Sequence, residues 1–195
     1  MECKRVKRMG RLANRPYVCG DCVETVSFYL FEVLQKSVQP VFICVGTPRV
    51  TGDALGPMVG SLVHAANPSI PLYGTMDSPI HALNLVQELQ RIRLSHPGST
   101  LIAVDSSLSS VDRVGYVCLD TGKLKPGRAT KRGLPSFGSY TLYGNIADAE
   151  KRSSSSCLER IATASPKFIE SMAKVMSTII LESWNRAFGL ELRTS

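Results

Sequence analysis

The sequence of 195 residues predicts an α/β fold, in which helices cover both faces of a central, mostly parallel sheet. One observation is that short, continuous apolar runs, typical of strands buried on both faces, alternate along the chain with segments of helical periodicity. A second observation is that this alternation begins and ends with a helix. Helical crossovers would therefore join the strands, as a parallel sheet requires.

The first half of the chain contains three expected helices and two expected strands. In order, we expect a helix over 22–36, a strand over 41–45, a loop over 46–53, a helix near 55–66, a strand over 70–74 and a helix from Ser78 to about Leu94. The first helix carries Val23, Val26 and Leu30 on one face. Ser78 and Pro79 are typical of an N-cap and a first helical turn.

The second half supplies further strands and the terminal helix. We expect strands over 100–104, 113–119 and 139–146, a long functional loop over 120–139, a polar linker over 153–156, and a helix from Ser165 and Pro166 to Phe188. The strand over 100–104 is expected to end at Asp105. Gly189 fits the position just after the last helix.

The composition is that of one globular domain. Hydrophobic residues make up 44% of the chain and charged residues 20%, and no apolar run is long enough to cross a membrane. The basic N-terminus is not followed by an apolar segment, so we expect no secretory signal. We divide the chain into a flexible basic arm over residues 1–18 and one α/β domain over residues 19–195.

The net charge of +7 is concentrated in the arm. Residues 1–16 carry six basic residues against the acidic Glu2, which gives this segment a charge of +5. Such an arm could touch nucleic acid or an acidic partner, or remain a solvated tail. No aromatic residue is interleaved in it and no recognised module follows it, so we do not expect nucleic-acid binding.

The six cysteines indicate a reducing compartment. Cys44 and Cys118 lie in apolar runs, where a reduced cysteine behaves as a small buried hydrophobe. The spacing is not that of a secreted disulfide scaffold, so we predict a cytoplasmic protein. Cys19 and Cys22 form a CxxC motif. No second cysteine pair is present to complete a zinc site, and the motif lacks the preceding strand that a redox CxxC requires.

The most unusual segment is the loop over 46–57, GTPRVTGDALGP, which follows a buried strand and opens a helix. In open α/β sheets ligands bind beyond the carboxyl ends of strands. The loop lacks both the GxGxxG spacing of dinucleotide sites and the GK[ST] of a P-loop. It contains Asp53, while Asp105 follows another strand at the same sheet edge. Taken singly, Asp53 is typical of a helix N-cap and Asp105 of a turn.

Together, the two aspartates form a candidate acid–base pair. If their strands are neighbours, the carboxylates would lie close to each other, and the pKa of one would rise while the other fell. Asp53 and Asp105 could then activate water with one member and protonate a leaving group with the other.

Other residues near this edge are candidates for binding the substrate. Thr47, Thr51 and the backbone at Gly46 and Gly52 could support a bound carbonyl or an attacking water. His81 could orient a carboxylate, contact the substrate or make a structural hydrogen bond at a helix start. The loop over 120–139 carries five basic residues that could bind an acidic peptide or be solvated: Lys123, Lys125, Arg128, Lys131 and Arg132.

Several separated motifs resemble one family. The segments GTPRVTGDALGP, YGTMDSPIHALNL, IAVDSSL, DTGKLKPG and KRGLP occur in this order, and over about residues 41–180 the chain resembles the YyaC-type sporulation proteins. This family is related to the spore germination protease and, more distantly, to the hydrogenase maturation peptidases. The resemblance implies a three-layer, phosphorylase/hydrolase-like sandwich, as in the maturation peptidases. It also implies that Asp53 in TGDALGP and Asp105 in AVDSSL match the essential aspartates of the germination protease.

The resemblance implies a sporulation-associated endopeptidase, a hydrolase of the forespore or sporulating cell that acts on a protein or peptide such as a small spore protein. The maturation peptidases grip nickel with two acids and a histidine, but residues 134–140 hold no histidine where the third ligand is expected. We therefore expect neither metal nor cofactor, although His81 could approach the site from another loop. The alternative is a non-catalytic sporulation protein that keeps the fold as a binding or regulatory module.

Overall fold

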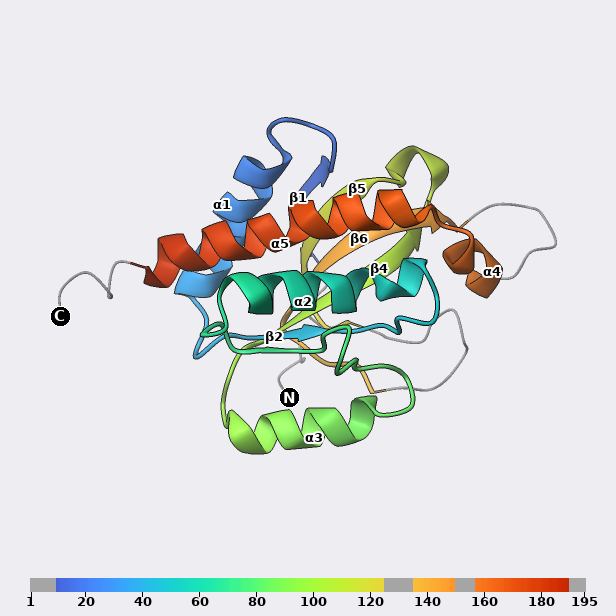
Figure 1. Ribbon diagram of the computed structural model, residues 1–195. Helices are drawn as coiled ribbons and strands as arrows, with labels where there is room; N and C mark the ends of the chain where they lie inside the picture. The colour runs from blue at the N-terminus through green and yellow to red at the C-terminus, as the bar shows by residue number, and fades with distance from the viewer. Residues whose placement is uncertain (1–9, 125–134, 150–156, 190–195) are drawn as a thin grey trace, which may run out of the picture.

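The computed structural model describes residues 10–124, 135–149 and 157–189 (Figure 1). Its six strands form one sheet in the order β1-β5-β6-β4-β2-β3. The strands are β1 (Gly10–Pro16), β2 (Val41–Cys44), β3 (Leu72–Tyr73), β4 (Leu101–Ser109), β5 (Tyr116–Thr121) and β6 (Tyr140–Asp148). Neighbours from β6 to β3 are parallel, while β5 runs antiparallel to both β1 and β6. The α/β fold class is therefore confirmed, with a mixed sheet.

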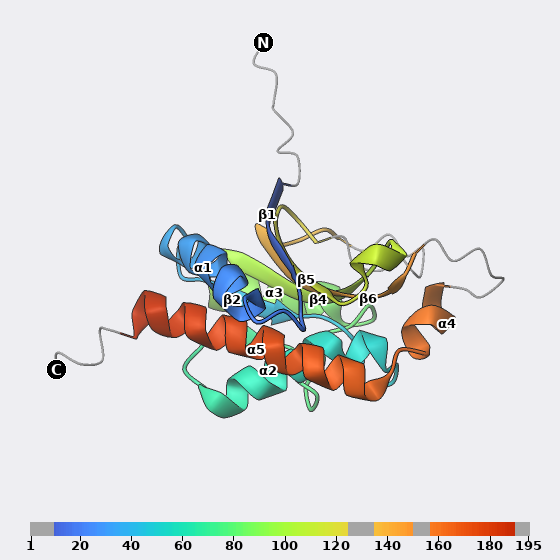
Figure 2. The same ribbon diagram turned by 90° about the horizontal axis from the view of Figure 1, so that it is seen from above.

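Helices lie on both faces of this sheet (Figures 1 and 2). They are α1 (Cys22–Gln35), α2 (Leu55–Ala66), α3 (Leu85–Ser95), α4 (Cys157–Ala162) and α5 (Pro166–Phe188), with short 3₁₀ turns η1 (Gly52–Ala54) and η2 (Val111–Arg113). No helix within the described residues is long and apolar enough to cross a membrane.

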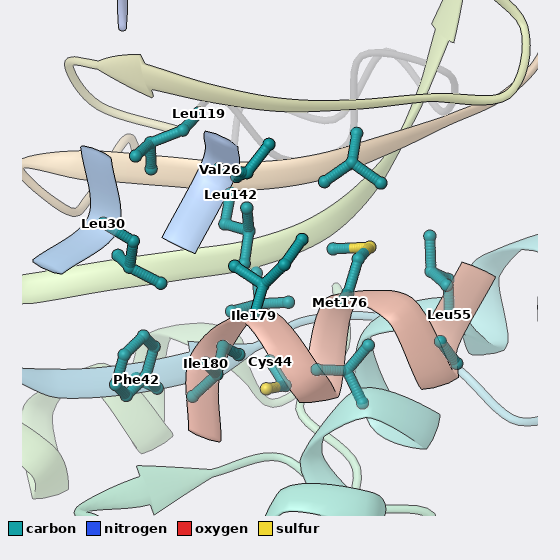
Figure 3. Packing of buried hydrophobic residues seen from close by; sticks show 14 of the residues in the cluster. Val26, Leu30, Phe42, Cys44, Leu55, Leu119, Leu142, Met176, Ile179 and Ile180 are labelled. Atoms are coloured by element: carbon teal, nitrogen blue, oxygen red, sulfur yellow. The ribbon is translucent and has the colours of Figure 1, made fainter. Parts of the chain in front are cut away.

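The larger hydrophobic core lies between the sheet and the helices α1, α2 and α5. Figure 3 shows side chains from all three helices meeting those of the strands. The labelled residues are Val26 and Leu30 of α1, Leu55 of α2, Met176, Ile179 and Ile180 of α5, and Phe42, Cys44, Leu119 and Leu142 of the sheet. Strands with apolar residues on this face and helices with one apolar stripe produce this layer directly.

The smaller core lies on the opposite face, under α3. Leu85, Leu89 and Ile92 of α3 pack against the other side of the sheet, including Ile43 and Ala103. Successive residues of β2 and β4 therefore point alternately into the two cores, which is why both strands are continuous apolar runs in the sequence.

Several boundaries differ from the sequence prediction, including β5, which was expected over 113–119, and α4, which was not expected. Three of the differences affect the sheet edge or the candidate site. Residues 10–16, which we placed in the flexible arm, form strand β1 and pair antiparallel with β5. This strand could not be recognised in the sequence, because Arg11 and Arg15 make the segment charged and an edge strand needs few apolar residues. The rest of the proposed arm up to residue 9 and the linker over 153–156 lie outside the described residues.

The other two differences lie next to the candidate site. Helix α3 begins at Leu85 and not at Ser78, because Ile80 forms a parallel bridge with Val45 and is therefore not available to a helix. Strand β4 does not end at Asp105 but continues to Ser109, because β6 pairs with it along this whole length.

The chain reverses direction along the sheet between β2 and β4. From β2 it passes through α2 to β3 on one side of β2, and then through α3 to β4 on the other side. Helices α2 and α3 lie on opposite faces. The carboxyl ends of β2 and β4 thus form a topological switch point, where ligands bind in open α/β sheets.

Candidate functional site

Asp53 lies in the 3₁₀ turn η1, at the end of the loop that follows β2. Its carboxylate is half-buried and accepts a hydrogen bond from the backbone N–H of Thr47 at 2.9 Å. The loop therefore folds back on itself over six residues, and its own backbone fixes the acid. The Thr47 side chain is not what holds the carboxylate.

Asp105 lies in β4, one residue beyond the last pairing of β4 with β2, which joins Val104 to Cys44. Alternate residues of a parallel strand direct their backbone groups to opposite neighbours, so Ser106 faces the side on which β2 has ended. The Ser106 N–H donates instead to the Asp105 carboxylate at 2.8 Å. The end of β2 thus explains why the Asp105 carboxylate turns toward the switch point.

The two carboxylates are electrostatically coupled. Burial raises the pKa of Asp53, although the Thr47 N–H and the nearby His81 act in the opposite direction. Burial raises the pKa of Asp105 well above its ordinary value, and the neighbouring Asp53 charge raises it further, against the Ser106 N–H. The prediction that the pKa of one aspartate would fall is therefore wrong, because burial raises both. Asp105 is the member of the pair that holds a proton more readily.

Gly46 packs between the segments that carry Asp53 and His81. Its φ of +147° suits glycine, and an added Cβ would lie 1.9 Å from the carbonyl oxygen of Asp53. On its other side, the Gly46 N–H donates to the Ile80 carbonyl at 2.8 Å. Only a residue without a side chain allows the two segments to approach this closely.

Residues 18–179 match the family model described as "Protein of unknown function (DUF1256)". The chain belongs to this family. It is also similar to "Uncharacterized protein YyaC" from Bacillus subtilis (strain 168), with 38% identity over 107 residues, which are 54% of this chain and 52% of that protein. The match therefore spans only about half of the length of this curated relative.

The family match includes every candidate residue of the sequence prediction. The structure brings Asp53, Asp105, Thr47 and His81 together at the switch point. Thr51 is the half-buried residue before η1, and Gly52 is buried within η1. A Cβ on Gly52 would lie 2.3 Å from Cδ1 of Ile146, so glycine is needed here because η1 packs closely against Ile146 of β6. Lys131 and Arg132 lie outside the described residues.

The sequence prediction missed a polar network on β1, β5 and β6. Arg11 forms an ion pair with Asp120 and donates from Nη2 to the Tyr143 hydroxyl at 2.9 Å. The Tyr143 hydroxyl donates to Asp120 at 2.8 Å, and burial raises the pKa of this tyrosine. Tyr143 pairs in register with Asp105, so both side chains lie on the same face of the sheet. The alternation of residues 116–121, with Cys118 and Asp120 opposite Val117 and Leu119, is the signal that could have revealed it.

Among the described residues, no group of three His, Cys, Asp or Glu side chains is arranged to hold an ion. Cys19 and Cys22 are both free thiols; Cys19 is exposed and Cys22 is buried. Burial raises the pKa of Cys22 to about 11, so the thiol is not a ready nucleophile at neutral pH.

Proposed function

We propose that this member of the family is a sporulation-associated endopeptidase in which Asp53 and Asp105 form the acid–base pair. The observation that supports it is the coupling of two half-buried carboxylates at the switch point, one of which has its pKa raised further by the other. In hydrolytic sites, two carboxyl groups often have different pKa values because their environments differ, and one then acts as acid and the other as base.

The proposed reaction is hydrolysis of a peptide bond. One carboxylate takes a proton from water while the water oxygen bonds to the carbonyl carbon. The other carboxyl group gives its proton to the amide nitrogen as the C–N bond breaks, which leaves a carboxylic acid and an amine. Return of the first proton to the second carboxylate through solvent restores the pair, so no oxidant, metal or covalent intermediate is required.

Several finer points belong to the same proposal. The peptide carbonyl would lie against Thr47, Thr51 and the backbone at Gly46 and Gly52, with His81 beside it. Lys131 and Arg132 would contact acidic groups of the substrate. We propose the forespore or sporulating cell as the location and small spore proteins as the substrates, on the basis of the resemblance of the TGDALGP and AVDSSL motifs to the germination protease.

Incubation of the purified chain with acid-soluble extract of spores tests the proposal. We expect the wild type to degrade one or more small proteins, and we expect Asp53→Asn and Asp105→Asn each to lower the rate by at least about 100-fold, since acid–base catalysis contributes about 10² to 10⁴. Asp77→Asn is a matched control, because Asp77 is exposed. Proteolysis that persists in both site variants would show that the pair is not catalytic.

A non-catalytic role is the second candidate. Both carboxylates accept backbone N–H groups, as capping and turn residues also do, and this arrangement would suit a binding module equally well. An intact extract together with a stable complex of the chain and an extract protein supports this candidate. Substitution of the aspartates would then alter affinity, and no cleavage would be seen with any variant.

A further inference from the structure

Strand β4 continues past the end of its neighbour β2. The pairing of β2 with β4 reaches only Val104, whereas β6 pairs with β4 as far as Ser109. The final backbone bond on the β2 side joins the Val45 N–H to the Val104 carbonyl at 2.8 Å. Within the described part of the chain, residues 105–109 are therefore paired on one side only. Their other side is the open edge of β4.

The backbone groups on this open edge belong to Ser106 and Leu108. In a parallel strand the N–H and C=O of one residue point to the same neighbour, and successive residues alternate between the two neighbours. The Val104 carbonyl points to β2, while the Ser109 carbonyl points to the β6 side, where it accepts the Ala149 N–H at 2.6 Å. Ser106 and Leu108 share the orientation of Val104.

Two of these groups remain available to another chain. The Ser106 N–H donates to the Asp105 carboxylate, and the Leu108 carbonyl accepts the Ser107 hydroxyl at 3.3 Å. Among the described residues, the Ser106 carbonyl and the Leu108 N–H form no backbone hydrogen bond. Leu108 and Ser106 are half-buried, so the edge is not sealed from solvent. Unpaired N–H and C=O groups along a strand edge are a template for a second extended chain.

The open edge begins at the candidate carboxylates. Asp105 is the first residue beyond the pairing with β2, and its carboxylate lies on the open side, where it accepts the Ser106 N–H at 2.8 Å. A strand added here would lie in line with β2, at about 4.8 Å from β4, and Leu108 is about 10 Å further along the edge than Asp105. A backbone bound at Ser106 and Leu108 would therefore continue past the Asp105 carboxylate.

The side chains beside this path are small on the face that carries Asp105. Ser107 and Ser109 alternate onto that face, whereas Leu108 packs against the larger core on the opposite face. Serine side chains leave room for neighbouring side chains of different sizes on an added strand. Affinity would thus come from main-chain hydrogen bonds, and the edge would select an extended conformation more than a particular sequence.

We propose that the open edge of β4 binds the substrate as an added strand, so that the substrate class is an unfolded, extended segment of polypeptide. This inference rests on the proposed function. The Leu108 N–H donates to a carbonyl of the bound segment, the Ser106 carbonyl accepts an N–H from it, and the peptide bond to be cleaved lies beside Asp105. A folded segment is excluded, because its own backbone groups are already paired.

Amide hydrogen exchange followed by NMR tests the binding without cleavage. The probe is reduced, carboxymethylated α-lactalbumin, which is unfolded, and the control is the native, disulfide-bonded form. Asp53→Asn is used so that the probe is not consumed. With millimolar unfolded probe, exchange of the Leu108 N–H should slow by at least about tenfold, while the Ser107 and Ser109 N–H groups, which face β6, serve as references. Unchanged Leu108 exchange, or equal protection by the native form, would overturn the proposal.

A proline at position 108 tests the same bond through activity. Leu108→Pro removes the N–H that faces the open edge and leaves the pairing with β6, since proline is accepted where a strand N–H is unpaired. Leu108→Ala is the matched control, because it loses the side chain but keeps the N–H. If spore extract is cleaved, KM should be about 5- to 10-fold higher in Leu108→Pro than in Leu108→Ala, as loss of one hydrogen bond implies.

The outcomes separate this inference from the proposed function. Equal KM values in the two variants, with circular dichroism showing both to be folded, would overturn binding at the edge even if the wild type proved proteolytic. The exchange experiment needs no change at position 108, so it decides the question if Leu108→Pro does not fold. Protection of Leu108 by the unfolded probe, with no cleavage of extract by the wild type, would retain binding at the edge and reject the peptidase.

Discussion

At the scale of single residues, Gly46 and the backbone N–H groups of Thr47 and Ser106 determine the candidate site. Gly46 lets two chain segments approach, and each N–H orients one carboxylate. In these contacts the carboxylates meet backbone groups and not cationic side chains. The geometry of the pair therefore depends on backbone conformation.

Gly46→Ala should be among the most destabilising single changes near the site. Its Cβ would lie 1.9 Å from the Asp53 carbonyl oxygen, so we expect a loss of more than about 3 kcal/mol in unfolding free energy. Gly98 is a matched control, because its φ of +78° also favours glycine but no atom lies within 4 Å of its added Cβ. We expect Gly98→Ala to cost only about 1–2 kcal/mol. Urea unfolding measures both, and equal losses would contradict the packing argument.

Asp105→Asn should change how stability depends on pH. A carboxyl group whose pKa is raised on folding makes the folded state bind more protons than the unfolded state above about pH 4. Stability of the wild type is therefore lost as pH rises through this window toward the raised pKa. The amide introduced by the substitution cannot ionise, and its oxygen can still accept the Ser106 N–H.

We expect Asp105→Asn to be more stable than the wild type at pH 7 and to differ little from it near pH 4, in thermal unfolding at a series of pH values. Asp77→Asn, on an exposed residue, should follow the wild-type curve. An Asp105→Asn variant with the same slope as the wild type would mean that the carboxyl group is not protonated preferentially in the folded protein.

At the scale of elements, β1 depends on a side-chain network as well as on its backbone pairing. Arg11 joins β1 to Asp120 of β5 and to Tyr143 of β6, across two neighbouring strands. Asp120 is only 5% exposed, so its charge needs both donors. The network thus links the edge strand to the strand that pairs beside Asp105.

Arg11→Met should weaken the fold, because it leaves the buried Asp120 with the Tyr143 hydroxyl as its remaining side-chain donor. We expect a loss of about 1–3 kcal/mol in urea unfolding. Arg15→Met on the same strand is the control, since the Arg15–Asp21 pair is exposed and should matter little. In Arg11→Met/Asp120→Asn the loss should be smaller than the sum of the single losses, and strict additivity would show that the two side chains do not interact.

At the scale of the whole molecule, two cores of unequal size hold helices on opposite faces of one sheet. The chain's one tryptophan, Trp184 of α5, reports on the larger core, because its ring centroid lies 6.3 Å from that of Phe42 in β2. Fluorescence of Trp184 therefore follows the packing of the last helix against a strand near the start of the chain.

Phe42→Ala should cost about 3–5 kcal/mol, since Phe42 is fully buried between α5 and the sheet. In the folded Phe42→Ala variant, the fluorescence emission of Trp184 should differ from that of the wild type. Phe28→Ala is the control, because Phe28 is 44% exposed and its contact with Arg186 is worth about 1 kcal/mol or less. If α5 folds together with the sheet, Trp184 fluorescence and far-ultraviolet circular dichroism should report the same unfolding transition. Two separate unfolding transitions would show that α5 and the sheet do not fold as one unit.

The sequence was sufficient for elements whose pattern is local. Helices α1, α2 and α5 and the buried strand β2 were expected nearly at their observed bounds, because each has an uninterrupted period of apolar residues. Strand β1 and the late start of α3 could not be predicted in this way. They depend on pairing with Thr121 and its neighbours and on the bridge between Val45 and Ile80, which are long-range contacts.

The same distinction applies to the candidate site. Asp53 and Asp105 follow apolar runs, so their common sheet edge could be predicted, and their catalytic role stays a prediction. The network of Arg11, Asp120 and Tyr143 escaped prediction because three strands must first be placed in the order β1-β5-β6, which no local pattern specifies. Burial of the aspartates likewise follows from the assembled fold.

The way in which backbone donors hold Asp53 and Asp105 has a consequence for ionic strength. Among the described residues, neither carboxylate forms a salt bridge, and each accepts an N–H from a residue at most six positions away. Added salt screens exposed pairs such as Lys36–Glu32 over a Debye length of about 8 Å at physiological strength, but it does not screen such short local bonds. The carboxylate pair should thus keep its arrangement in concentrated salt, where surface ion pairs no longer contribute.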